Sequence, residues 1–199
     1  MPWDKGFNFR ATAVFVTDGT DETYDIGTVY PVTRNGATFG WAEASEGDAR
    51  DRDALVDRRL AGIMNRDNVE TAKTWRLDLP ATGDFTIRLA AGDTEFSRIE
   101  DLELLDDNTV FATVADNVSV AQDNYLDATG VTRTEANWPS QNATLSRTFT
   151  STILRVRIAG LSAPSGSSGI AHVFVSQVAA AEGPSATIPA SPLVGNLRW

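Results

Sequence analysis

The sequence predicts an all-β protein: an antiparallel, jelly-roll-like β-sandwich in one domain with an extended C-terminal arm. Three observations predict it: apolar and polar residues alternate with period two in several segments, turn-forming residues separate these segments, and helical periodicity is nearly absent. Many short strands with regular turns are typical of antiparallel sandwiches, whereas a parallel sheet needs crossover helices. We therefore divide the chain into a sandwich domain, residues 1–180, and an arm, residues 181–199.

The clearest alternation lies in TWRLDLPATGDFTIRLAAGD, residues 74–93. The apolar side chains that share a face are Trp75, Leu77 and Leu79 before the corner and Phe85, Ile87 and Leu89 after it. This pattern predicts two strands with one dry and one wet face, because successive Cβ atoms point to opposite faces of a sheet. Pro80 removes a ladder donor and ends the first strand, so the segment is a β-hairpin or a corner with Trp75 in the core.

Other segments carry the same strand signals. Asn35-Gly36 predicts a hairpin, because a type I′ turn needs positive φ at both central residues. The remaining expected strands lie within residues 12–26, 110–120, 146–160 and 170–180. Helical spacing occurs in residues 49–64, where one turn or a short helix on a loop is expected.

Composition excludes several classes of function. The formal net charge is -10, so the surface repels phosphate backbones and anionic lipid headgroups, and neither nucleic acid nor membrane is an expected partner. No run reaches the roughly 20 apolar residues of a membrane helix, and the N-terminal residues lack the pattern of a secretory signal. The chain has no Cys, which excludes disulfides and thiolate zinc sites.

Catalytic signals are weak, and we expect no catalytic residues. The single histidine, His172, lies in an apolar strand on the same face as Ile170 and Phe174, which favours a structural role. Residues 166–169 lack the G-x-S-x-G spacing of a nucleophile elbow. Pairs of carboxylates that act together in glycoside hydrolysis are spatial rather than sequential, so a glycan-active hydrolase is the least favoured reading.

Two acidic stretches could bind a hard cation such as calcium. They are Asp18, Asp21, Glu22 and Asp25 in the first, and Asp106, Asp107 and Asn108 in the second. Neither has the spacing of an EF-hand, and Asp and Asn in turns bond to nearby backbone with or without a metal. We therefore expect no cofactor and leave calcium open.

Aromatic residues give the candidate ligand site. Trp138 and Tyr125 lie in polar loops with Asn137, and aromatic rings flanked by amides suit a platform on which sugars stack. The alternative is that these rings plug the open end of the sandwich. Trp41 ends the Asn-Gly hairpin and is expected in the core.

The arm is the candidate assembly element. Residues 181–199 are rich in Ala, Ser and Pro, which excludes a central strand. Its apolar residues Leu193, Leu197 and Trp199 either have no role or dock onto a neighbouring subunit.

Five pieces of residues 7–110 carry a resemblance: FNFR (7–10), TFGW (38–41), RDR (50–52), DRRLAG (57–62) and the whole of residues 74–93. Together they resemble the galactose-binding-like β-sandwich domains found beside rhamnogalacturonan acetylesterases and other polysaccharide-acting enzymes. The resemblance implies that this last segment is a hairpin at the sandwich core whose Gly-Asp opens a loop. Arg10 stands where Gly is common and Ala81-Thr82-Gly83 replaces an Asn-Gly corner, so no sugar site is carried over.

An acidic, all-β chain without Cys or a signal pattern, ending in an arm with apolar residues, also resembles small virion proteins of tailed phages. We therefore expect a non-catalytic virion subunit, capsid-decorating or tail-associated, on the surface of the particle. Its partners would be other virion proteins and further copies of itself, with a trimer as the favoured homo-oligomer. The alternative is a soluble module that binds a polysaccharide glycan.

Overall fold

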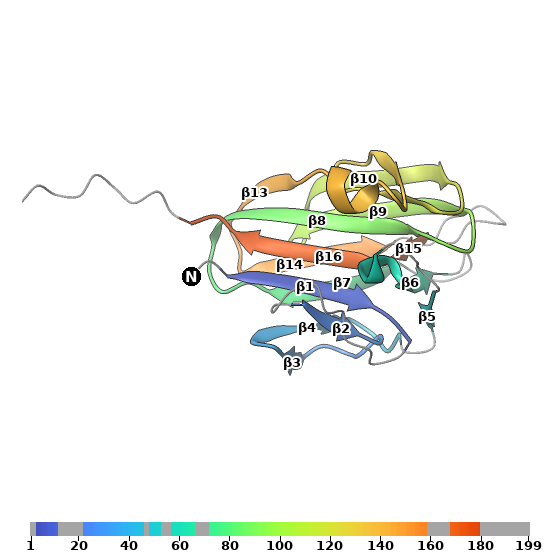
Figure 1. The fold of residues 1–199 in the computed structure, drawn as a ribbon. Helices are drawn as coiled ribbons and strands as arrows, with labels where there is room; N and C mark the ends of the chain where they lie inside the picture. Colours follow the sequence, from blue (N-terminus) through green and yellow to red (C-terminus); the bar gives the residue numbers. More distant parts are fainter. Residues whose placement is uncertain are drawn as a thin grey trace, which may run out of the picture.

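The computed structural model describes residues 3–11, 22–45, 48–52, 57–66, 72–158 and 168–179. Two large sheets stack face to face, and a small third sheet closes one end of the stack (Figure 1). The strands are β1 Asp4–Phe9, β2 Glu22–Asp25, β3 Val32–Arg34, β4 Ala37–Trp41, β5 Ala49–Asp51, β6 Gly62–Arg66, β7 Lys73–Asp78, β8 Gly83–Asp93, β9 Arg98–Asp106, β10 Thr109–Val120, β11 Asn124–Leu126, β12 Thr132–Thr134, β13 Leu145–Phe149, β14 Ile153–Ile158, β15 Ser168–Ile170 and β16 His172–Gln177. The short helices are η2 Arg58–Leu60 and α1 Trp138–Gln141. The all-β sandwich prediction is confirmed, and the arm, residues 181–199, lies outside the described residues.

Strand order separates the layers. The first sheet runs β12-β11-β8-β16-β1-β2 with β13 also paired to β8, the second runs β10-β9-β14-β7-β4-β3, and the small sheet runs β15-β6-β5. The sequence predicts antiparallel pairing throughout. The ladders of the described strands are antiparallel except one, because β1 and β2 pair in parallel. Residues 12–21, which join these two strands, lie outside the described part of the chain.

Residues 74–93 form a corner between sheets, and the hairpin reading is wrong. Strand β7 pairs with β14 and β4 in the second sheet, whereas β8 pairs with β16, β11 and β13 in the first. The chain crosses the sandwich at Pro80, where β7 has ended. The predicted alternation is confirmed, since Trp75, Leu77, Phe85 and Ile87 are all fully buried.

A second corner breaks the strand expected over residues 146–160. Strand β13 belongs to the first sheet and β14 to the second. Asp106 fixes the corner by accepting bonds from the backbone N–H groups of Thr150 (2.8 Å) and Ser151 (3.0 Å). Burial alone would raise the pKa of Asp106, but the hydrogen bonds from Ser151 and Thr150 outweigh it and lower the pKa to about 2.

Local turn and helix predictions also fit the structure. Asn35 (φ 47°) and Gly36 (φ 70°) form the expected left-handed pair between β3 and β4. Within residues 49–64 only the single turn η2 is helical among the described positions, and β5 and β6 flank it.

Aromatic rings fill the core between the two large sheets. Trp75 packs edge-on against Phe7 at 4.8 Å and Phe9 at 5.5 Å, and Phe9 packs against Trp41 at 5.6 Å. Trp41 is fully buried, as expected. The indole N–H of Trp75 donates to the buried carboxylate of Asp25 at 2.9 Å.

Candidate functional site

The predicted ligand residues Trp138 and Tyr125 lie in a second, small core on the outer face of the first sheet. This cluster consists of Leu60, Ala90, Tyr125, Trp138 and Ala171. Helices η2 and α1 carry two of its members over the sheet (Figure 1). Trp138 is 1% exposed and its indole N–H donates to the carbonyl of Leu89 at 3.0 Å. Tyr125 is fully buried.

Burial corrects the expected glycan platform. Neither ring of Trp138 or Tyr125 offers a face to solvent, so the packing alternative describes both. Of the three predicted residues, Asn137 alone is exposed, where it precedes α1. His172 is 1% exposed and meets Trp138 edge-on at 5.7 Å, so its ring is buried, as expected of a histidine in an apolar strand.

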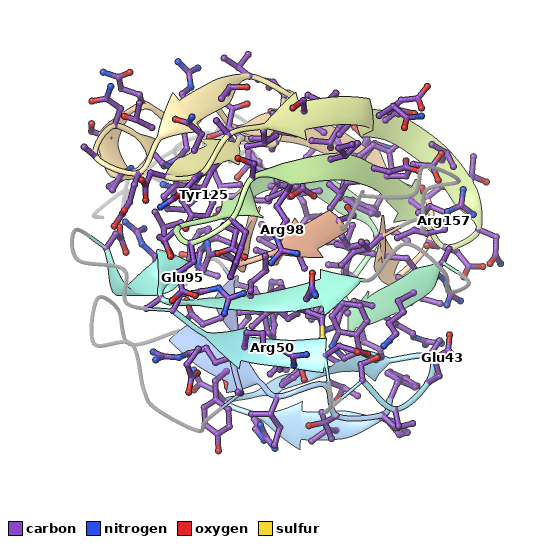
Figure 2. The ribbon with its side chains drawn as sticks, turned by 90° about the vertical axis from the view of Figure 1, so that its right-hand side faces the viewer. Glu43, Arg50, Glu95, Arg98, Tyr125 and Arg157 are labelled. Atoms are coloured by element: carbon purple, nitrogen blue, oxygen red, sulfur yellow. The ribbon has the colours of Figure 1, made fainter. Side chains whose placement is uncertain are left out.

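A buried ionic cluster lies at the end of the sandwich that the small sheet covers. Figure 2 looks onto this end, with Arg50 on β5 in front and with Arg98 and Glu95 near the small sheet. Asp93, the last residue of β8, is 1% exposed and accepts hydrogen bonds from Arg52 Nε at 2.8 Å and Nη2 at 3.0 Å. Arg98, at the start of β9, donates to the same carboxylate through Nε at 3.1 Å and through Nη2.

The charges of this cluster offset one another. Burial alone would raise the pKa of Asp93, but hydrogen bonds from Arg52 and Arg98 outweigh it and hold the pKa below its ordinary value. Asp93 is therefore an ionised counter-ion for two guanidinium groups. Glycine is required at position 92, just before Asp93. Its φ is +148°, and a Cβ there would lie 2.2 Å from the carbonyl oxygen of Asn124 on the paired strand β11.

The loop between β8 and β9 presents an exposed aromatic ring above this cluster. Phe96 is 55% exposed, and the guanidinium carbons of Arg52 and Arg98 lie 5.4 Å and 5.9 Å from its ring centroid. Arg52 also pairs with Glu95 at 3.5 Å. Cations at such distances are attracted by the electron-rich face of the ring and orient it.

A second loop braces the first. The backbone N–H of Gln122 donates to the hydroxyl of Ser97 at 3.2 Å, and that of Asp123 donates to the carbonyl of Asp93 at 3.1 Å. We call the exposed surface formed by these two loops the Phe96 platform, and its residues are Glu95, Phe96, Ser97, Gln122 and Asp123. Sequence reasoning missed it, although the Gly-Asp at its base had been singled out.

The acidic stretches serve local structure where they are described. Asp25 accepts bonds from the backbone N–H groups of Gly27 (2.8 Å) and Thr28 (2.9 Å), and Asp107 pairs with Arg155 at 2.9 Å. Asp18 and Asp21 lie outside the described residues. Across the described ranges, no three His, Cys, Asp or Glu side chains gather closely enough to hold a metal ion, and no helix is long and apolar enough to cross a membrane.

A shallow hollow of about 280 Å³ lies at the opposite end of β8. Its lining residues are Asp84, Phe85, Ser146, Arg147, Thr148 and Val178. It opens beside the end of β16, away from the Phe96 platform.

Comparison with known proteins defines the fold and no family. No protein-family model and no curated protein matches the chain. Among solved structures, a chain in the crystal structure of the plant peptide RALF23 in complex with FER and LLG2 has a TM-score of 0.50 and 12% identity over 88% of this chain and 40% of that chain. The ANX2 ectodomain from Arabidopsis thaliana has a TM-score of 0.49 and 8% identity over 89% of this chain and 50% of that chain. CBM35 from Paenibacillus barcinonensis has a TM-score of 0.31 and 13% identity over 69% of this chain and 97% of that chain.

The chain thus spans 40% and 50% of the two plant chains that it resembles. At such identities the similarity concerns the fold alone. The first of these matches agrees with the β-sandwich described above.

Proposed function

We propose that the protein is a non-catalytic binding module that recognises carbohydrate at the Phe96 platform. The observation that carries the proposal is an exposed aromatic ring fixed by two buried arginines. Phe96 is 55% exposed, whereas Arg52 and Arg98 beside it have side chains 9% and 5% exposed. A single exposed apolar side chain is ordinary on a protein surface, and what sets Phe96 apart is that two buried guanidinium groups lie against its ring.

The chemistry of the platform suits a sugar. An aromatic ring can stack on the C–H face of a pyranose, and the neighbouring carboxylate, amide and hydroxyl groups of Glu95, Gln122 and Ser97 can bond to its hydroxyls. The ionic cluster keeps the ring oriented before the ligand arrives. Preorganisation of this kind lowers the entropic cost of binding.

The sequence resemblance supports the same proposal. The stretch that resembles galactose-binding-like domains most closely, residues 74–93, ends on Asp93, and this carboxylate accepts bonds from both arginines beside the Phe96 ring. The proposal thus replaces Trp138 and Tyr125, which are buried, with a site whose aromatic ring, Phe96, lies within the resembling residues 7–110.

A glycan array with three proteins tests the proposal. Wild type is compared with Phe96→Ala, which removes the ring, and with Val110→Ala as a matched control. Val110 is 40% exposed and follows the turn after β9, at the end of that strand opposite Arg98. We expect wild type and the control to bind the same plant or bacterial polysaccharides. Phe96→Ala should lose about 5- to 150-fold in affinity, taking for the ring the roughly 1–3 kcal/mol of a nucleic-acid base stacked on an aromatic side chain. Equal binding by all three proteins, or none by wild type, would contradict the proposal.

The virion hypothesis concerns assembly rather than this surface. Its motivating residues Leu193, Leu197 and Trp199 lie outside the described residues, so a phage role, a homo-oligomer and a place on the particle stay predictions.

A further inference from the structure

The small sheet is held to the sandwich by one polar anchor for each of its strands. Arg52, directly after β5, bonds to Asp93 of β8. Asn65 of β6 accepts a bond from Arg98 of β9. On β15, Ser168 and Gly169 donate to Glu100 of β9.

The third anchor differs from the other two in its electrostatics. Glu100 is fully buried and points into the sandwich, in phase with Leu102 along β9. Its Oε2 accepts from the hydroxyl of Ser168 and the backbone N–H of Gly169, both at 2.9 Å. Its Oε1 is buried with no hydrogen-bond partner among the described residues. A carboxylate with one such oxygen is less well solvated than in water, and a proton on it would remove the charge.

Within the part of the chain that the structure describes, no cationic side chain bonds to Glu100. Arg98, on the same strand, is attractive but is already bonded to Asp93, whose own charge opposes ionisation of Glu100. The contacts from β15 are the neutral groups of Ser168 and Gly169, and on β10 the residue opposite in register is Val118. An ionised Glu100 would therefore be a poorly compensated buried charge.

We propose that Glu100 is a proton-dependent latch, which holds β15 and the small sheet closed when protonated and loosens them when it ionises. Burial raises the pKa of Glu100 to about 7 from an ordinary value of 4.5. When the small sheet opens, the carboxyl meets water and regains its ordinary acidity. Opening is thus unaffected by pH below 4.5, becomes easier as the pH rises to about 7, and levels off above that.

The latch reaches the Phe96 platform through Arg98. This side chain bonds to Asn65 of the small sheet and also lies beside the ring of Phe96. Loosening of the small sheet would therefore weaken ligand binding at neutral pH relative to pH 5. This consequence rests on the proposed carbohydrate function, whereas the latch does not.

Hydrogen exchange of wild type from pH 5 to pH 8 tests the latch without a variant. The amides to follow lie in Ala49–Asp51, Gly62–Arg66 and Ser168–Ile170, with rates corrected for the intrinsic pH dependence of exchange. A pKa of about 7 closed and 4.5 open predicts that the opening equilibrium of these strands rises about 70-fold over this range. Amides of β7 and β14, in the centre of the second sheet, serve as the internal reference.

Two variants test whether the pH dependence of exchange comes from Glu100. Glu100→Gln cannot ionise and should make exchange of the small sheet independent of pH, whatever its absolute rate. Glu103→Gln is the same substitution on the same strand, at a carboxylate that pairs with Arg157 instead, and should keep the wild-type pH dependence.

Each outcome decides a separate point. Exchange of the small sheet that does not change with pH in wild type, or an unchanged pH dependence in Glu100→Gln, would overturn the latch. Glycan binding measured at pH 5 and pH 8 on the same proteins is a second arm. A confirmed latch with no glycan binding would contradict the proposed function alone.

Discussion

Asp93→Asn tests whether the ionic cluster holds the end of the sandwich together. The carboxylate is 1% exposed and accepts bonds from Arg52, from Arg98 and from the backbone N–H of Glu95. Asn carries no charge and offers one acceptor oxygen, so two buried guanidinium groups lose their counter-ion. Removing one partner of a buried ion pair costs about 3–5 kcal/mol, because the remaining charge is left uncompensated. We expect the free energy of unfolding to fall by at least about 3 kcal/mol.

Urea unfolding at pH 7, followed by tryptophan fluorescence, measures this loss. An unchanged m-value would show that the denatured state is the same in both proteins. The matched control is Asp78→Asn on the outer face of the second sheet, where the side chain is 33% exposed and accepts from Arg76 Nε at 2.8 Å and the hydroxyl of Tyr30 at 2.8 Å. That variant should lose about 0–1 kcal/mol. Equal losses for the two substitutions would refute the reasoning that burial sets the energy.

Two further predictions follow from local geometry and a third from the sequence of the arm. Gly83→Ala, at φ +129° in open space, should cost about 1–3 kcal/mol of backbone strain. Gly92→Ala should lower the melting temperature further, because its Cβ would also meet the carbonyl oxygen of Asn124. Equal melting temperatures of the two variants would contradict this. Trp75→Phe removes a donor to Asp25, whose pKa burial already raises to about 6, so the pKa should rise further in a carbon-detected NMR titration. Since ionising Asp25 destabilises the folded state, the variant should lose more unfolding free energy than wild type as the pH rises from 3.8 past 6, and a parallel pH dependence would count against the argument. Removing residues 184–199 should lower the oligomer mass in light scattering if the arm assembles the virion subunit, and an unchanged mass would leave the arm without that role.

The fold class could be predicted because alternation and turn chemistry are local properties. Trp75 and Leu77 share the buried face, because alternate residues of a strand point to the same side of the sheet. Asn35-Gly36 forms a turn because both residues tolerate positive φ. Which sheet a strand joins is not local. Period-two alternation is the same in a hairpin and in a corner, so residues 74–93 could not be assigned to one or the other without the strand pairing.

The site was harder to predict, because it depends on which outer sheet faces are covered by a further layer of the chain. Trp138 and Tyr125 lie on the outer face of a sheet, and only the packing of η2 and α1 shows that this face is closed. A usable signal was nevertheless present in RIEDLELLD, residues 98–106. Arg98 and Glu100 are in phase with apolar residues on the buried face, and polar groups in such positions must find partners inside the protein.

An amide NMR titration of the full chain with the polysaccharide fragment that binds most strongly on the array tests the binding surface most directly. The account predicts that the largest shift changes fall on residues 94–97 and 121–123, and that Phe96→Ala removes them. Changes confined to the hollow beside Val178, or to the outer face of the second sheet, would contradict it.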